Sequence, residues 1–362
     1  MTAAFLPGLA LSRRFYAERV RPVLDESFPG LPYSAGLIGW GSEVLGFDSP
    51  RSADHNFGPR LQIFLGDDER AGAVREEIGA SLPGEFHGYP TVFAASGASP
   101  DDASHWVEVA GLGDWLTGHL GFDPAAGVRL LDWLATPTQL LAEVTGGAVF
   151  HDGLALTGGG LAGARAALAW YPRDVWYYVL ACQWQRIDQE EPFPGRCAEA
   201  GDELGSAIVA ARLVRDLTRL LLLMQRRYPP YSKWLGTALA RSAAGPGLIP
   251  LLTGAVTAAT WPDREDRLCA SYEAAARLHN ELGLTARLDP LVRPTYYDRP
   301  FRVLGAARFA AALREAITDE RIRALPPIGA IDQFVDSTDA IGNERLRRAA
   351  IIAQLGDQGE ST

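Results

Sequence analysis

The stretch GLIGWGSEVLGFDSPRSADHNFGPRLQIFL, residues 36–65, decides the fold of the N-terminal half. Its apolar ends predict strands over residues 34–38 and 59–65. Gly41 and Ser42 follow the first strand, and eleven residues separate Ser42 from Asp54. That distance is long enough for a short helix and a turn into the second strand. The stretch therefore predicts a strand, a Gly-Ser turn into a helix, and a return strand.

The polar residues of this stretch suit a phosphate and a metal ion. A Gly-Ser pair between a strand and a helix presents backbone N–H groups and a hydroxyl at the positive end of the helix dipole. Asp54 and Asn56, just before the second strand, offer oxygen ligands to the cation that accompanies a nucleoside triphosphate. A structural interpretation stays open for each feature, with Ser42 as a helix cap and Asp54 in an Asx turn.

Outward from this stretch, the pattern alternates between strand and helix periods up to about residue 123, and helical spacing dominates from residue 128 onward. The further strands are predicted over 91–95 and 106–109, and the helices over 11–28, 67–82, 128–135, 138–145, 160–170, 174–189, 199–228, 233–241, 263–282 and 308–317. We expect an α+β protein with a small mixed-sheet domain at 1–125, a helical bundle at 126–345 and a frayed tail at 346–362.

The composition limits the classes of function. Thirty-four basic residues against 44 acidic residues give a net charge of −10, so no broad cationic surface is available for duplex nucleic acid. No apolar run is long enough to cross a membrane, and the N-terminus lacks a secretory signal pattern. Cys182, Cys197 and Cys269 lack CxxC spacing and are expected to be reduced core thiols. We therefore expect a cytoplasmic protein, and its oligomeric state is not predicted.

The order of these polar residues resembles the nucleotidyltransferase superfamily typified by DNA polymerase beta and the aminoglycoside nucleotidyltransferases. That superfamily carries Gly-Ser, a gap of similar length, two acidic residues one position apart, and a third carboxylate on a later strand. Gly41 and Ser42 match the first part, Asp54 matches the first metal ligand, and Glu108 is the candidate for the third. The second acidic position holds Asn56, whose carbonyl can bind Mg²⁺ but adds no charge.

Over its whole length, the chain resembles a bacterial family of unknown function that combines such a domain with a helical domain. The recurring stretches of that family appear here as GSEVLGFD (41–48), SADHNFGPRLQIFL (52–65), GDELGS (201–206), YSKWLG (231–236) and IDQFVDS (331–337). The resemblance implies a nucleotidyltransferase-like fold, Mg²⁺ or Mn²⁺ as the metal, and a nucleoside triphosphate (NTP) as the co-substrate.

Three basic residues are candidates for contacting phosphates. Lys233 is the only lysine in the chain, and all other basic residues are arginine. Since an ammonium and a planar guanidinium are not interchangeable at a phosphate, Lys233 is the candidate for the β- and γ-phosphates. Packing of its stem against Trp234 is the alternative. Arg51 and Arg60 flank the Asp54 motif and are further candidates, with a surface position as the alternative for either.

Asp202 and Glu203 open the longest predicted helix, where they could act as general bases or as partners of the helix dipole. The leading hypothesis is a metal-dependent nucleotidyltransferase that moves an NMP group from an NTP to a small-molecule hydroxyl or amine, with the metal held by Asp54, Asn56 and Glu108. The alternative is a non-catalytic nucleotide-binding sensor or antitoxin-like protein, in which Asn56 leaves the metal site degenerate.

Overall fold

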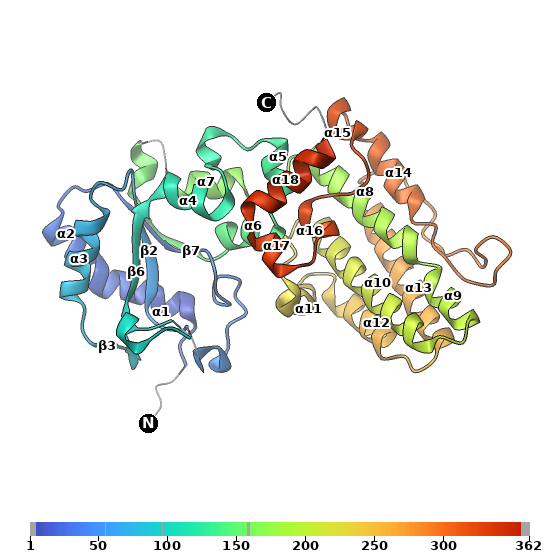
Figure 1. Cartoon of the computed structure of the whole chain (residues 1–362), viewed down its shortest axis with the longest axis horizontal. Coiled ribbons are helices and arrows are strands. Elements are labelled where there is room, and N and C mark those ends of the chain that lie inside the picture. Colours follow the sequence, from blue (N-terminus) through green and yellow to red (C-terminus); the bar gives the residue numbers. More distant parts are fainter. Residues whose placement is uncertain (1–4, 55, 96, 158–159, 356–362) are drawn as a thin grey trace. The chain divides into compact units, whose positions relative to one another are not determined.

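The computed structural model describes residues 5–54, 56–95, 97–157 and 160–355, and it is an α+β fold (Figure 1). Contacts divide the chain into two compact units. The first comprises Met1–Asp132 and Leu140–Ala169, and the second comprises Trp133–Gln139 and Trp170–Thr362. The division differs from the expected boundary at residue 125, because a strand at residues 148–152 returns to the sheet of the first unit.

The first unit contains a five-stranded mixed sheet in the order β5-β6-β2-β1-β7, beside a separate β3–β4 pair. β2 and β6 are parallel, and the other neighbouring strands of the sheet are antiparallel. Strands form in all four predicted places, and β7 was not predicted. The strands are β1 (Ser34–Leu37), β2 (Arg60–Leu65), β3 (Glu85–Phe86), β4 (Tyr89–Pro90), β5 (Val92–Phe93), β6 (Ser104–Gly111) and β7 (Ala148–Asp152).

Helices of the first unit follow the predicted pattern with two exceptions: α4 was not predicted, and the short α-helix predicted after Ser42 is absent from the described residues. The predicted helix over 11–28 is present as α1, a π-helical turn at Tyr16–Val20, and α2, which follow one another without a break. The α-helices in residues 5–169 are α1 (Gly8–Phe15), α2 (Arg21–Ser27), α3 (Ala71–Ser81), α4 (Leu112–Leu120), α5 (Leu130–Ala135), α6 (Thr138–Thr145) and α7 (Leu161–Ala167). The 3-10 helices are η2 (Pro50–Asp54), η3 (Pro100–Asp102), η4 (Pro124–Ala126) and η5 (Gly153–Thr157).

One face of the sheet is buried under apolar side chains of α1, α2 and α3. Leu61 and Ile63 of β2 and Val107 of β6 point to this face and pack with residues such as Leu11 and Ile78. Because side chains alternate along a strand, the residues between them point to the opposite face. That opposite face carries polar residues of β2 and β6, and it positions the candidate site.

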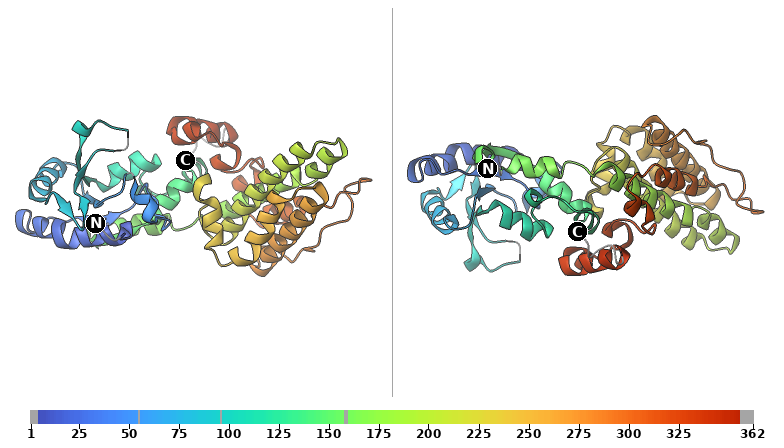
Figure 2. Two further views of the ribbon diagram at one scale, coloured as in Figure 1. Left: turned by 90° about the horizontal axis from the view of Figure 1, so that it is seen from below. Right: turned by 90° about the horizontal axis from the view of Figure 1, so that it is seen from above.

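The second unit is all helical apart from two isolated β-bridges, and Figure 2 shows its long helices packed side by side. α8 packs against α10 and α14, and α13 packs against α10 and α12. The helices are α8 (Arg173–Glu190), α9 (Phe193–Glu199), α10 (Glu203–Met224), α11 (Ser232–Ala240), α12 (Gly245–Thr257), α13 (Trp261–Glu281), α14 (Ala307–Glu315), α15 (Glu320–Ala324), α16 (Ile331–Phe334), α17 (Thr338–Gly342) and α18 (Glu344–Leu355).

The C-terminal segment is more ordered than expected. α18 covers residues 344–355, so the expected frayed tail from residue 346 is wrong for its first ten residues, and residues 356–362 lie outside the described part. Across the described ranges, no helix combines the length and apolar character needed to cross a membrane. All three cysteines are unpaired, and burial raises the pKa of the Cys182 and Cys269 thiols to about 12 each.

Candidate functional site

Gly41 and Ser42 lie in a loop of turns that follows β1. The backbone N–H of Phe47 donates to the Ser42 carbonyl oxygen at 2.8 Å, and the N–H of Gly46 donates to the Glu43 carbonyl oxygen at 3.1 Å. The next helical segment is the 3-10 helix η2, which begins eight residues after Ser42, at residue 50. The predicted helix behind Ser42 is therefore wrong, and no helix dipole points at a ligand there.

Arg60 holds this loop in place from the first position of β2. Its Nε donates to Glu43 Oε1 at 2.8 Å, and its guanidinium also donates to the Trp40 carbonyl oxygen and lies 3.9 Å from the centroid of the Trp40 ring. Gly41 has a φ of 127°, and a Cβ there would collide with the Arg60 guanidinium and the Glu43 carboxylate. Arg60 is thus a buried loop anchor, and the alternative of a surface charge is wrong for it.

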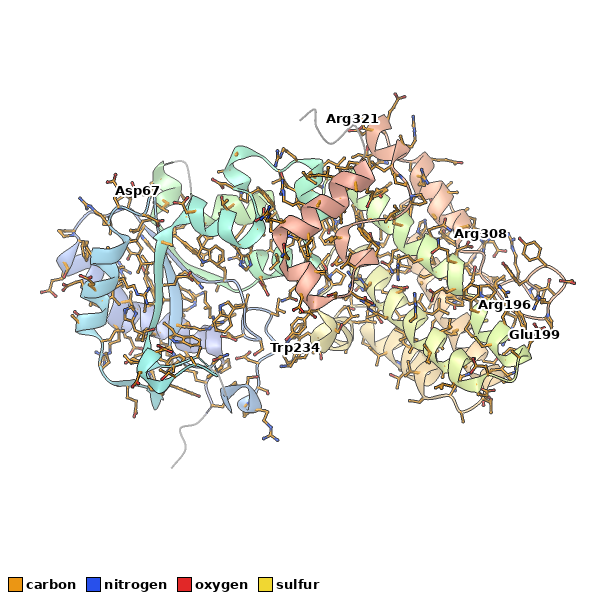
Figure 3. All side chains as sticks on the ribbon, viewed as in Figure 1. Asp67, Arg196, Glu199, Trp234, Arg308 and Arg321 are labelled. Carbon is orange, nitrogen blue, oxygen red and sulfur yellow. The ribbon has the colours of Figure 1, made fainter. Side chains whose placement is uncertain are left out.

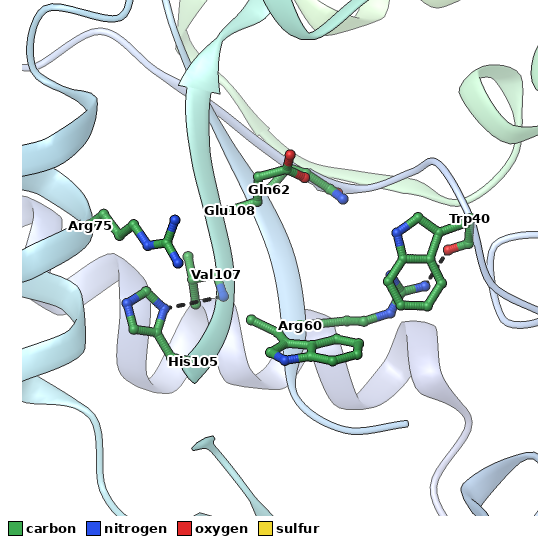
Figure 4. A pocket seen from close by; sticks show the side chains of 8 residues that line it. Trp40, Arg60, Gln62, Arg75, His105, Val107 and Glu108 are labelled. Carbon is green, nitrogen blue, oxygen red and sulfur yellow. Dashed lines mark hydrogen bonds between the residues drawn. The ribbon is translucent and has the colours of Figure 1, made fainter. Parts of the chain in front are cut away.

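A cavity of about 270 Å³ opens beside the amino ends of β2 and β6 (Figure 4). The strand register pairs Arg60 with Trp106 and Gln62 with Glu108, so these four side chains share one face of the sheet. The indoles of Trp40 and Trp106 meet edge to face with their centroids 5.5 Å apart, and Trp40 is 48% exposed. The cavity therefore offers accessible aromatic surface beside a carboxylate.

Arg75 of α3 and His105 of β6 complete the lining, and Figure 4 shows them on the other side of β6 from Trp40. β5 pairs only with Ser104 and His105, so the described chain leaves the remainder of that β6 edge without a strand partner. Burial, together with the charge of Arg75, lowers the pKa of His105. His105 is therefore neutral near pH 7, and Arg75 is the positive charge at this edge.

Gln62 and Glu108 differ in burial and in their contacts with the rest of the protein. The Gln62 amide is buried and exchanges hydrogen bonds with the Ile38 backbone, accepting from its N–H at 3.1 Å and donating to its oxygen at 3.3 Å. Glu108 is exposed and forms no ion pair with any described residue. Glu108 is thus the carboxylate of the cavity that remains available to a ligand.

The structure describes the predicted metal ligands Asp54 and Asn56 to different extents. Asp54 is the last residue of η2, and its side chain, like the whole of His55, lies outside what the structure describes. Asn56 is partly buried, with a left-handed backbone at φ 50°. Within the described residues, no group of three His, Cys, Asp or Glu side chains is arranged to hold a metal ion. A metal site at Asp54, Asn56 and Glu108 stays a prediction.

The candidate acids of the second unit have structural partners. Asp202 is the N-cap of α10 and accepts a hydrogen bond from the Gly205 N–H at 2.7 Å. Glu203 forms an ion pair at 3.1 Å with Arg264, whose side chain is buried, and accepts from the Trp261 N–H at 3.3 Å. Asp202 therefore lies at the N-terminus of α10, as the helix-dipole alternative expects, whereas Glu203 is engaged by Arg264; the general-base role of both stays a prediction.

Two of the three predicted cationic contacts, Lys233 and Arg51, are exposed. Lys233 lies on α11, and its Nζ is 4.9 Å from the centroid of Trp234, a residue labelled in Figure 3. This contact places the ammonium near the Trp234 ring, and both the phosphate role and the packing of the stem stay predictions. Arg51 is exposed on η2 in the first unit.

The first four residues of the IDQFVDS stretch form α16, and the stretch fixes the C-terminal segment within the second unit. Asp332 forms a buried ion pair with Arg219 at 2.8 Å and accepts from the Thr138 N–H at 3.0 Å. Gln333 donates to the Val179 carbonyl oxygen at 3.0 Å. The stretch therefore has a structural role, because Asp332 and Gln333 join segments of α6, α8 and α10 that are distant in the sequence.

Six lining residues were not predicted as site residues, namely Trp40, Gln62, Arg75, His105, Trp106 and Val107. A signal for one of them, Gln62, is present in the sequence. Arg60 and Gln62 are polar residues at alternate positions of an otherwise apolar strand, which is typical of a strand with one polar face. No comparable pattern marks Trp40 or Arg75.

Comparison with known proteins gives one match. A family model described as a domain of unknown function, DUF4037, matches residues 133–235. This segment contains Asp202, Glu203 and Lys233 and none of the lining of the Trp40 cavity. No curated protein and no solved structure matches the chain.

Proposed function

We propose that the protein is a nucleotidyltransferase that moves an NMP group from an NTP to a hydroxyl or amine of a small molecule. The supporting observation is the order of neighbouring strands. β1, β2 and β6 are adjacent, so the end of β1 and the beginnings of β2 and β6 meet at one end of the sheet. The Gly41-Ser42 loop, the segment before Arg60, and Glu108 therefore belong to one region of the fold.

In this proposal, the cavity binds the base of the nucleotide. The indoles of Trp40 and Trp106 provide a surface on which an aromatic ring stacks. The volume of about 270 Å³ is close to the lower limit of roughly 300 Å³ for small-molecule pockets. Arg75 provides the positive charge for a phosphate oxygen, and Arg60 keeps the loop in the binding conformation.

Mg²⁺ or Mn²⁺ would be held by Asp54, Asn56 and Glu108. The donor chemistry fits, since a hard cation takes carboxylate and carbonyl oxygens and Glu108 is an exposed carboxylate at the cavity. When bound, such a metal supplies neutralisation of the charge on the reacting phosphate. We propose the cytoplasm as the location, which the three unpaired cysteines support.

A second candidate is nucleotide binding without transfer, and Asn56 is the residue that favours it. An amide at this position adds no charge to the proposed metal site. If the site is a weakened catalytic one, Asn56→Asp should tighten divalent-metal binding. Unchanged metal affinity would favour a protein that binds the nucleotide alone.

Metal-dependent release of pyrophosphate tests the proposed reaction. ATP, GTP, CTP and UTP are supplied separately, with and without pooled small metabolites. Release is expected with wild-type protein and Mg²⁺, and a loss is expected in Glu108→Gln. Glu76→Gln is the matched control, because Glu76 is an exposed acid on α3 that does not line the cavity. Saturable NTP binding without any release would instead support the second candidate.

A further inference from the structure

A second cavity, of about 520 Å³, lies at the opposite end of the β2–β6 pair. The register pairs Leu65 with Gly111 at this end, and the residues that follow, Gly66 and Leu112, line the cavity. Its volume is within the roughly 300–1,000 Å³ typical of small-molecule sites. It belongs entirely to the first unit and shares no lining residue with the Trp40 cavity.

The walls of this cavity are mostly apolar and built from small residues. Leu112 and Leu116 of α4, Leu154 of η5 and Ala164 of α7 contribute apolar surface. The start of α7 is not an anion site, because the Asp152 carboxylate accepts from the N–H groups of residues 161 and 162 at 3.0 and 2.9 Å. The cavity therefore suits an apolar body and offers no helix terminus to an anion.

The charge of the lining is negative. Asp123 is its one charged side chain, and no Lys, Arg or His belongs to the described lining. Asp123 Oδ1 accepts from the Ala125 N–H at 2.9 Å, whereas Oδ2 faces Gly113, where an added Cβ would lie 3.1 Å away. The chain neighbours of the lining residues Gly66 and Gly113 are Asp67, which Figure 3 labels, and Asp114. This arrangement disfavours anions and attracts cations.

We propose that this cavity binds a small organic cation with an apolar body. The ammonium group forms a charge-assisted hydrogen bond with Asp123 Oδ2, and the body packs on Leu112, Leu116 and Ala164. Because the two cavities share no lining residue, binding of the cation does not depend on the proposed nucleotide site.

Two variants separate the charge from the shape of the site. Asp123→Asn removes the charge but keeps an oxygen that can accept from the Ala125 N–H. Gly163→Leu narrows the cavity from α7, where an added Cβ has no heavy atom within 4 Å and where leucine favours the helix. Gly118→Leu is the matched control, because it is also helical and open but does not line the cavity.

The test is calorimetric titration of the full-length protein with benzylamine. Benzyl alcohol is the probe that lacks the charge, and methylammonium is the probe that lacks the apolar body. Benzylamine is expected to bind saturably, and both other probes about tenfold or more weakly, a difference of about 1.4 kcal/mol. Asp123→Asn and Gly163→Leu should each weaken benzylamine by about tenfold or more, and Gly118→Leu should not. Melting curves confirm that each variant folds. Absence of saturable binding, or equal benzylamine affinity in wild type and both site variants, would overturn the proposal.

Discussion

The Arg60 guanidinium and the Glu43 carboxylate form an ion pair at 2.7 Å, with 4% and 6% of the two side chains exposed. Removing one partner leaves a buried charge without compensation, which typically costs roughly 3–5 kcal/mol. Glu43→Ala should therefore strongly lower the free energy of unfolding measured in urea. The double variant Glu43→Leu with Arg60→Met should recover part of that loss. A double variant no more stable than Glu43→Ala would contradict the pairing as the cause.

Gly41 and Gly46 of the same loop should respond differently to alanine. Gly46 has a φ of 72° with no heavy atom near an added Cβ, so Gly46→Ala costs only backbone strain, about 1 kcal/mol. Gly41→Ala adds a collision with Arg60 and Glu43, and a loss of roughly 3 kcal/mol is expected. Urea unfolding of both variants measures the difference. Equal losses would mean that the loop moves to accept the methyl group.

His279 should make stability depend on pH. Burial lowers its pKa to about 4 from an ordinary 6.5, and its Nε2 lies 2.9 Å from Thr285 Oγ1. Between those pH values the unfolded chain binds a proton that the folded chain excludes, so stability falls as the pH falls through this window. The full effect is on the order of 3 kcal/mol.

His279→Leu should remove this slope, and the difference in unfolding free energy between wild type and variant, from pH 7 to pH 4, measures it. Burial raises the pKa of Glu191 to about 7, which gives an opposite slope in an overlapping window. Because both proteins retain Glu191, its contribution cancels in the difference. Parallel curves for wild type and variant would show that His279 does not titrate as expected.

The strands at residues 34–37 and 60–65 could be predicted because their apolar runs are bounded by turn residues. β7 could not be predicted, since its five residues gain their strand partner, β1, from more than a hundred positions earlier in the chain. α4 contains glycines, and α12 contains both glycines and prolines, so the local sequence predicts a helix only weakly at either place. Both segments are helical because tertiary packing overrides the low propensity.

Only part of the candidate site could be expected from the sequence, and the roles of its residues stay predictions. The Gly41-Ser42 loop and Glu108 were identified from spacing and resemblance, and the fold places Glu108 and the loop residue Trp40 at one cavity. The buried role of Arg60 depends on Glu43 and Trp40 folding back over it, which no local pattern encodes. Arg75 reaches the cavity from α3, and only the packing of that helix on β6 determines this.

Lys233→Ala tests the phosphate role of the only lysine. If the ammonium contacts the β- and γ-phosphates, NTP affinity should fall by about ten- to a hundredfold and NMP affinity should change little. Lys233→Arg should restore only part of that loss, because the planar guanidinium places its donors differently. Packing on Trp234 alone predicts that arginine is tolerated and that NTP and NMP affinities shift together. Titration of both nucleotides into both variants decides between these roles.

In the proposed function, the N-terminal unit binds a nucleoside triphosphate together with a divalent metal. Calorimetric titration of ATP, GTP, CTP and UTP into the full-length protein, in Mg²⁺ and in EDTA, tests it most directly. At least one nucleotide should bind wild-type protein much more tightly in Mg²⁺ than in EDTA, and Asp54→Ala should abolish that dependence, since the carboxylate would hold the metal. Equal affinity in Mg²⁺ and EDTA, or a metal dependence that survives in Asp54→Ala, would contradict the account.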